Sequence, residues 1–171
     1  MTDQRNLPFE TPPREQIPQI SRWHIEGMES SRSDDVWTGA GMKHIIVHTI
    51  GRKSGNVHKV ALPFWVDADG HRMVVGSYSG APAHPDWYLN LASLDTPAEV
   101  ICHVKSHRYW AEIDVVAGDD YTATWAALTA DRPYYQDYQN QTERRLPLIR
   151  LREIRPADAP AGAVVSADGV E

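Results

Sequence analysis

The sequence is short of cysteine and of long apolar runs, and each shortage excludes a class of protein. Cys102 is the one cysteine among 171 residues, which rules out an intramolecular disulfide and a zinc site built from several cysteines. No apolar stretch approaches the ~18 residues of a membrane-spanning helix, and residues 1–20 lack the apolar centre of a signal peptide. We therefore expect one cytoplasmic domain, since a domain usually takes ~100–200 residues.

Basic charge is also scarce. Lys and Arg number 17 against 23 Asp and Glu, which gives a formal charge of −6. Nucleic-acid-binding surfaces are basic, so no nucleic-acid partner is expected. Residues 1–35 hold seven acids and four arginines, unlike a basic membrane-surface helix, so we expect peripheral membrane attachment at most and no stable insertion. The eight histidines include no His-Glu-x-x-His, and no metal site is predicted.

Runs of β-branched residues bounded by turn residues predict a sheet, with short helices beside it. The expected strands are 43–50, 57–66, 72–76, 98–104, 108–116 and 146–154, and the expected helices are 20–28, 85–94, 119–130 and 135–145. Hairpin spacings and too few crossover helices disfavour a doubly wound parallel sheet. The predicted fold is mostly β (α+β), a six-stranded antiparallel barrel with peripheral helices. It divides into an N-terminal arm with a short helix (1–40), a barrel domain (41–155) and a flexible tail (156–171).

The turn Gly51-Arg52-Lys53-Ser54-Gly55 follows a predicted strand and is rich in groups that bind anions. Glycine lets the backbone approach a ligand closely, and exposed N–H groups beside Arg and Lys suit a phosphate. Residues 51–60 contain no acid, although the chain is acidic overall. A solvated hairpin turn has the same composition, so both interpretations stay open at this point.

Two further segments carry candidate groups. Residues 76–90 pass from a loop of small residues into a helix N-terminus, where Trp87 and Tyr88 are adjacent. Such a loop can lie against a ring system, and a helix N-terminus can hold an anion. Tyr135 and Tyr138 are three residues apart, so on a helix they share a face and their hydroxyls can bind a substrate oxygen. Core packing is the alternative explanation for each segment.

Together these segments resemble the deazaflavin-dependent nitroreductase family. The motifs that carry the resemblance are Gly51-Arg52-Lys53-Ser54-Gly55, Ala83-His84-Pro85-Asp86-Trp87-Tyr88-Leu89-Asn90-Leu91, and Asp137-Tyr138-Gln139 … Thr142-Glu143-Arg144 … Leu146-Pro147. The similarity covers residues 41–154. It implies a split β-barrel of the FMN-binding-like type, in an enzyme that uses reduced coenzyme F420.

The resemblance also implies roles for individual residues. Ser77 lies beside the deazaflavin ring, and Tyr135 and Tyr138 line the substrate side, so these are the predicted catalytic residues. The basic turn holds the phosphate and the glutamyl tail of the cofactor. The predicted cofactor-binding residues are Arg52, Lys53, Ser54, Gly55, His58, Lys59, Ala61, Leu62, Pro63, Val75, Gly76, Ser77, Tyr78, Asp86, Trp87, Tyr88 and Asn90.

The implied function is hydride transfer from reduced F420 to an electron-poor acceptor: an activated alkene or enone, a quinone or a nitro compound. The cofactor carries the hard chemical step, while the protein supplies orientation and charge. Two alternatives remain, an FMN-dependent split-barrel oxidoreductase and a non-catalytic barrel that binds a cofactor or lipid. The expected partner is a small-molecule electron acceptor, and the expected state is a monomer or a homodimer.

Overall fold

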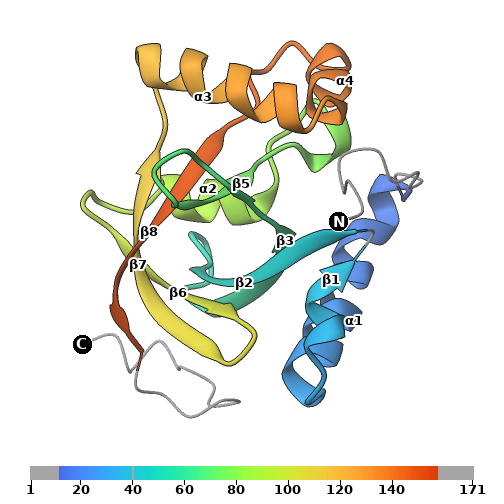
Figure 1. The fold of residues 1–171 in the computed structure, drawn as a ribbon, viewed down its shortest axis with the longest axis vertical. Helices are drawn as coiled ribbons and strands as arrows, with labels where there is room; N and C mark the ends of the chain where they lie inside the picture. Colours follow the sequence, from blue (N-terminus) through green and yellow to red (C-terminus); the bar gives the residue numbers. More distant parts are fainter. Residues whose placement is uncertain (1–11, 40, 158–171) are drawn as a thin grey trace.

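Eight strands form one antiparallel sheet that curls into a half-barrel, with helices around it (Figure 1). This computed structural model describes residues 12–39 and 41–157. The strands are β1 (Thr38–Gly39), β2 (Met42–Ile50), β3 (Val57–Pro63), β4 (Trp65–Val66), β5 (Arg72–Val75), β6 (Glu99–Val104), β7 (His107–Val115) and β8 (Leu148–Pro156). The α-helices are α1 (Ile17–Ser30), α2 (Asp86–Ala92), α3 (Gly118–Asp131) and α4 (Tyr134–Asn140). The 3-10 helices are η2 (Arg14–Gln16), η3 (Asp34–Trp37) and η4 (Tyr78–Gly80).

The sheet curls where one predicted strand, residues 57–66, pairs with two different neighbouring strands. The hydrogen-bonded order is β1-β2-β6-β7-β8-β5-β4, and β3 pairs with β2. Only Phe64 separates β3 from β4, so the segment 57–66 runs along β2 first and along β5 afterwards. Phe64 N–H still donates to Lys43 O of β2 at 3.0 Å, and the side chain of Phe64 is buried in the core, where the segment turns from β2 toward β5. The predicted antiparallel α+β architecture is confirmed. The predicted count of six strands is wrong, because 57–66 is two strands and β1 precedes β2.

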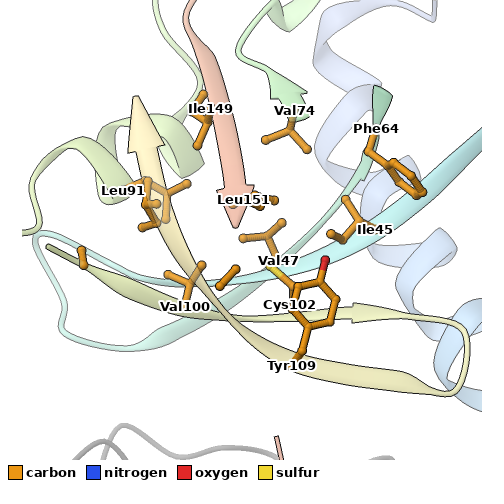
Figure 2. Packing of buried hydrophobic residues seen from close by; sticks show 13 residues of the cluster. Ile45, Val47, Phe64, Val74, Leu91, Val100, Cys102, Tyr109, Ile149 and Leu151 are labelled. Carbon is orange, nitrogen blue, oxygen red and sulfur yellow. The ribbon is translucent and has the colours of Figure 1, made fainter. Parts of the chain in front are cut away.

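Apolar side chains fill the inside of the half-barrel, where strands from both ends of the sheet face one another (Figure 2). Ile45, Val47, Ile149 and Leu151 are each 0–1% exposed, and they lie together although β2 and β8 are far apart in sequence. Alternation along a strand sends every second side chain to this face. A second cluster lies where α3 and α4 cover one end of the half-barrel (Figure 1).

The N-terminal segment packs on the outer face of β2 and β3. Ile25 and Met28 of α1 join Trp37 and Ile46 in a third buried cluster. The backbone N–H of Ala61 in β3 donates to Ser21 Oγ of α1 at 3.1 Å. The predicted boundaries between arm, barrel and tail stay a prediction, and residues 1–11 and 158–171 lie outside the described residues. No helix in the described part of the chain is long and apolar enough to cross a bilayer.

Candidate functional site

The basic turn between β2 and β3 is tightly closed, and it exposes the side chains predicted to bind an anion. Gly51 N–H donates to Asn56 O at 2.8 Å, and Gly55 N–H donates to Gly51 O at 2.8 Å. Gly55 has φ +72, a left-handed conformation that glycine adopts without strain. Residues 52–55 are exposed. The turn therefore presents Lys53 and Ser54 to solvent, and Arg52 with a side chain that is 25% exposed.

Helix α2 anchors this turn. Asn90, which is 6% exposed, accepts from the backbone N–H of Arg52 at 3.2 Å and from its Nη1 at 3.1 Å. The Asn90 amide donates to Thr49 Oγ1 at 3.4 Å. Arg52 Nη2 also pairs with Asp86 Oδ1 at 3.0 Å. The structure thus brings three predicted cofactor residues together, and Asn90 supports the turn rather than standing open to a ligand.

The loop that follows β5 has an unusual backbone. Tyr78, Ser79 and Gly80 have φ of 44, 51 and 72, all left-handed. This conformation costs free energy at the two residues that carry a Cβ, and such strain clusters at functional sites. A Cβ at Gly80 would lie 2.7 Å from Tyr138 O, so α4 packs directly on the loop. Ser77 lies at the start of this loop and is half-buried.

Arg144, in the segment between α4 and β8, donates hydrogen bonds to the backbone of this loop. Its Nε donates to Ala81 O at 2.7 Å, Nη1 to Gly76 O at 2.9 Å, and Nη2 to Ser77 O at 2.8 Å. Nη1 also lies 3.1 Å from His84 Nδ1, so that nitrogen accepts and the imidazole is neutral. Burial and the Arg144 charge lower the pKa of His84, which favours this neutral form. Arg144 was not a predicted site residue, and the Thr142-Glu143-Arg144 motif was the one sign of it in the sequence.

Helix α2 links the basic turn to the strained loop. Asp86 and Asn90 face the turn, as described above, while the ring of Tyr88 lies 4.8 Å from the His84 ring, centroid to centroid. His84 in turn contacts Arg144. A ligand bound between the turn and the loop would therefore have both ends of its site fixed by one short helix.

The tyrosines of α4 form a cluster, but they differ in exposure. Tyr135 is 5% exposed and belongs to the second buried cluster, whereas Tyr134 and Tyr138 are half-buried. The Tyr135 and Tyr138 rings are 6.2 Å apart, and Tyr134 OH donates to Met42 Sδ at 3.0 Å. Burial raises the pKa of Tyr135 well above its usual value, so its hydroxyl stays protonated. Tyr138 is the predicted catalytic tyrosine with the more accessible ring.

Most of the other predicted cofactor residues contact α1 or pack against buried clusters. Lys59 pairs with Glu29 of α1 at 2.6 Å, and Ala61 packs against the third cluster. His58 lies beside Gly51, where a Cβ would come within 2.9 Å of its Nε2. Leu62, Trp87 and Tyr88 pack against the main core, Val75 belongs to the second cluster, and Pro63 ends β3. Their contact with a cofactor stays a prediction.

A metal centre and a groove are two other kinds of site to consider among the described residues. No group of three or more His, Cys, Asp or Glu side chains there could hold a metal ion. An open groove of about 460 Å³ lies between the end of α2 and strand β7, and Leu94, Pro97 and Val115 are among its lining residues. No predicted site residue lines this groove, so it is separate from the turn and the loop.

Known proteins resemble this chain over most of its described residues. The sequence profile of the F420H(2)-dependent quinone reductases matches residues 21–153. An F420H(2)-dependent quinone reductase of Mycobacterium tuberculosis is 27% identical over 108 residues, which is 63% of this chain and 71% of that protein. A solved F420-H2 dependent reductase superposes with a TM-score of 0.53 at 26% identity, covering 64% of this chain and 93% of the other. A second chain, solved as a domain-swapped dimer, gives a TM-score of 0.55 at 26% identity and covers 77% of this chain and 98% of the other.

Proposed function

The chain belongs to the F420H(2)-dependent quinone reductase family, and we propose that it transfers a hydride from reduced F420 to a quinone-type acceptor. Membership confirms the expectation of an F420-dependent reductase and favours F420 over FMN as the cofactor. The observation that carries the proposal is the pairing of an exposed Arg52-Lys53-Ser54 turn with the strained Ser77 loop through one helix.

The chemistry of the exposed groups fits an anionic cofactor. Arg52, Lys53 and Ser54 follow one another in an exposed turn, with no acid among residues 51–60. Guanidinium, ammonium and hydroxyl groups form charge-assisted hydrogen bonds to phosphate and carboxylate oxygens. These three residues would hold the phosphate and the acidic tail of F420. The rest of the protein is net negative, so the turn is a local positive entry for such a ligand.

The loop after β5 would hold the ring end. When bound, the reduced deazaflavin supplies the hydride, and the chain's residues orient it and exclude water. Ser77 and Tyr78 would contact the ring, because the backbone there is held by Arg144 and turned by successive left-handed residues. Fixed geometry of this kind makes the transfer effectively unimolecular.

The acceptor would lie against α4. Tyr138 packs beside the strained loop, since its carbonyl oxygen faces Gly80. A tyrosine hydroxyl there can donate a hydrogen bond to a quinone or enone oxygen as negative charge develops on it. Tyr135 is buried behind it and would fix the Tyr138 ring. We also propose enones and nitro compounds as acceptors, and either a monomer or a homodimer as the active state.

The test is a titration of the purified chain with F420, followed through the fluorescence of the cofactor. Turnover is then measured with reduced F420 and three acceptors: a soluble quinone such as menadione, an enone and a nitroimidazole. Reduced FMN at the same concentration is the control. We expect saturable F420 binding and quinone turnover that FMN does not support. Binding without turnover of any acceptor would favour the non-catalytic alternative, and turnover with FMN alone would contradict the proposal.

A further inference from the structure

The connection between α4 and β8 is built around one side chain, Gln139. Its Nε2 donates to Thr142 O at 3.3 Å and to Arg144 O at 2.8 Å, and its Oε1 accepts from Leu146 N–H at 2.9 Å. The Thr142 hydroxyl accepts from Arg144 N–H at 3.4 Å. These bonds fix the backbone on both sides of Arg144, which limits the directions that its side chain can take.

The guanidinium of Arg144 then reaches a loop more than 60 residues earlier in the sequence. Three of its donors bond to the carbonyls of Gly76, Ser77 and Ala81, at 2.7–2.9 Å. The planar guanidinium holds its donors in a fixed fork spread over three nitrogens, whereas the three donors of a lysine ammonium rotate about one nitrogen and cannot reproduce that geometry. The contact encloses Ser77 and the left-handed residues that follow it.

The same connection touches the loop at a second point. Gly76 N–H donates to Pro147 O at 2.9 Å, and a Cβ on Gly76 would lie 2.5 Å from Pro147 Cγ. The start of the loop is therefore pressed against Pro147, while its middle is hydrogen-bonded to Arg144. Two left-handed residues with side chains, Tyr78 and Ser79, persist only where their surroundings hold them.

We propose that Arg144 is a positioning residue for the cofactor ring: it fixes the Gly76–Ala81 loop in its strained form, so that Ser77 and Tyr78 meet the ring. The inference rests on the proposed function, because it names the part of the F420 site that Arg144 serves. The Arg144 guanidinium donates to three backbone carbonyls and to His84 Nδ1, so it acts through the loop and not on the reacting atoms.

The experiment compares Arg144→Met and Arg144→Lys with Arg145→Met in the full chain. Arg145 is the adjacent arginine, and its guanidinium lies 4.0 Å from the centroid of the Tyr121 ring rather than on the loop. The control therefore loses the same charge one residue away. Each variant is titrated with complete F420 and with a fragment that has the deazaflavin ring but neither phosphate nor glutamates. Thermal unfolding is followed in parallel.

We expect Arg144→Met to weaken binding of both ligands by the same factor, at least ~10-fold, through loss of charge-assisted hydrogen bonds. Arg144→Lys should recover part of that loss, and Arg145→Met should stay within ~2-fold of the parent, as expected of a surface change. Arg52→Ala should instead weaken complete F420 and leave the ring fragment unchanged. In turnover, Arg144→Met should raise KM for F420 and also lower kcat, whereas Arg52→Ala should raise KM alone.

Two outcomes would overturn the inference. One is an Arg144→Met chain that folds and binds the ring fragment as tightly as the parent. The other, if Arg144→Met does not fold, is an Arg144→Lys chain with the parent's ring affinity and kcat. A parent that binds neither ligand would overturn the proposed function itself, which separates the two failures.

Discussion

Arg52 carries an ion pair that an anionic ligand must replace on entering the basic turn. Its Nη2 lies 3.0 Å from Asp86 Oδ1, with the two side chains 25% and 87% exposed. Because Asp86 is so exposed, solvent screens the pair, and such pairs contribute ~0.2–1 kcal/mol. A charge-assisted hydrogen bond to a phosphate contributes ~1.5–3 kcal/mol. We therefore expect the phosphate to displace Asp86 from the Arg52 guanidinium.

Three substitutions test this competition. Arg52→Ala and Lys53→Ala should each weaken F420 binding by ~1–3 kcal/mol, and the loss should shrink at high salt because exposed charges are screened over ~8–10 Å. Asp86→Asn should tighten F420 binding by ~1.4- to 5-fold, because Arg52 then binds the ligand without first losing its ion pair. Arg52→Ala keeps the bond from its backbone N–H to Asn90, so the turn should stay folded.

The assay is F420 fluorescence titration at low and at physiological salt, with Asp69→Asn as the charge-matched control in the turn between β4 and β5. If both alanine variants bind F420 as tightly as the parent at low salt, this turn does not hold the cofactor. If Asp69→Asn tightens binding as much as Asp86→Asn does, Asp86 does not compete with the ligand for Arg52. An equal effect would mean that only net charge matters.

Three further predictions concern catalysis and stability. Tyr138→Phe should lower kcat by ~10- to 1000-fold, the range for losing one oxyanion donor, with F420 affinity nearly unchanged in titration; Tyr135→Phe should have the smaller effect because that ring is buried. Arg150, which is 6% exposed and bonds to three carboxylates, should cost ~3–5 kcal/mol of unfolding free energy when changed to Met, measured in urea. Burial and nearby charges lower the pKa of His44 and His48 from the ordinary 6.5 to about 4. As the pH falls, these histidines therefore bind protons at a higher pH in the unfolded chain than in the folded chain. Stability should be full above pH 6.5 and fall by ~2 kcal/mol per histidine at pH 5; a flat profile in urea unfolding would contradict this.

Local patterns in the sequence were sufficient for most strands and for the position of the basic turn. The β-branched run 44–50 and the glycines at 51 and 55 predict a strand followed by a tight turn, and β2 and its turn follow that pattern. Pro85 before α2 agrees with the predicted helix start. These features depend on residues within a few positions of one another, and backbone propensity and side-chain alternation act over that distance.

Helix ends and strand divisions were less predictable. The helix expected over 135–145 ends at Asn140, because the Gln139 side chain takes over the hydrogen bonds of the following turn. No glycine or proline marks that stop in residues 138–145. Likewise, the break at Phe64 depends on β4 finding β5 as its partner. A side chain that replaces a backbone bond leaves no periodic signal.

The residue pattern alone was sufficient to predict most strands, an exposed cationic turn at residues 52–54 and the motifs that resemble a reductase family. How these groups contact one another depends on the tertiary structure. It joined Arg144 to a loop more than 60 residues away, tied Arg52 to α2, and buried Tyr135 while leaving Tyr138 accessible. Residue type fixes what a side chain can bond to, whereas its partner depends on which distant segments pack together. That choice comes from burial of the whole core, which no local pattern encodes.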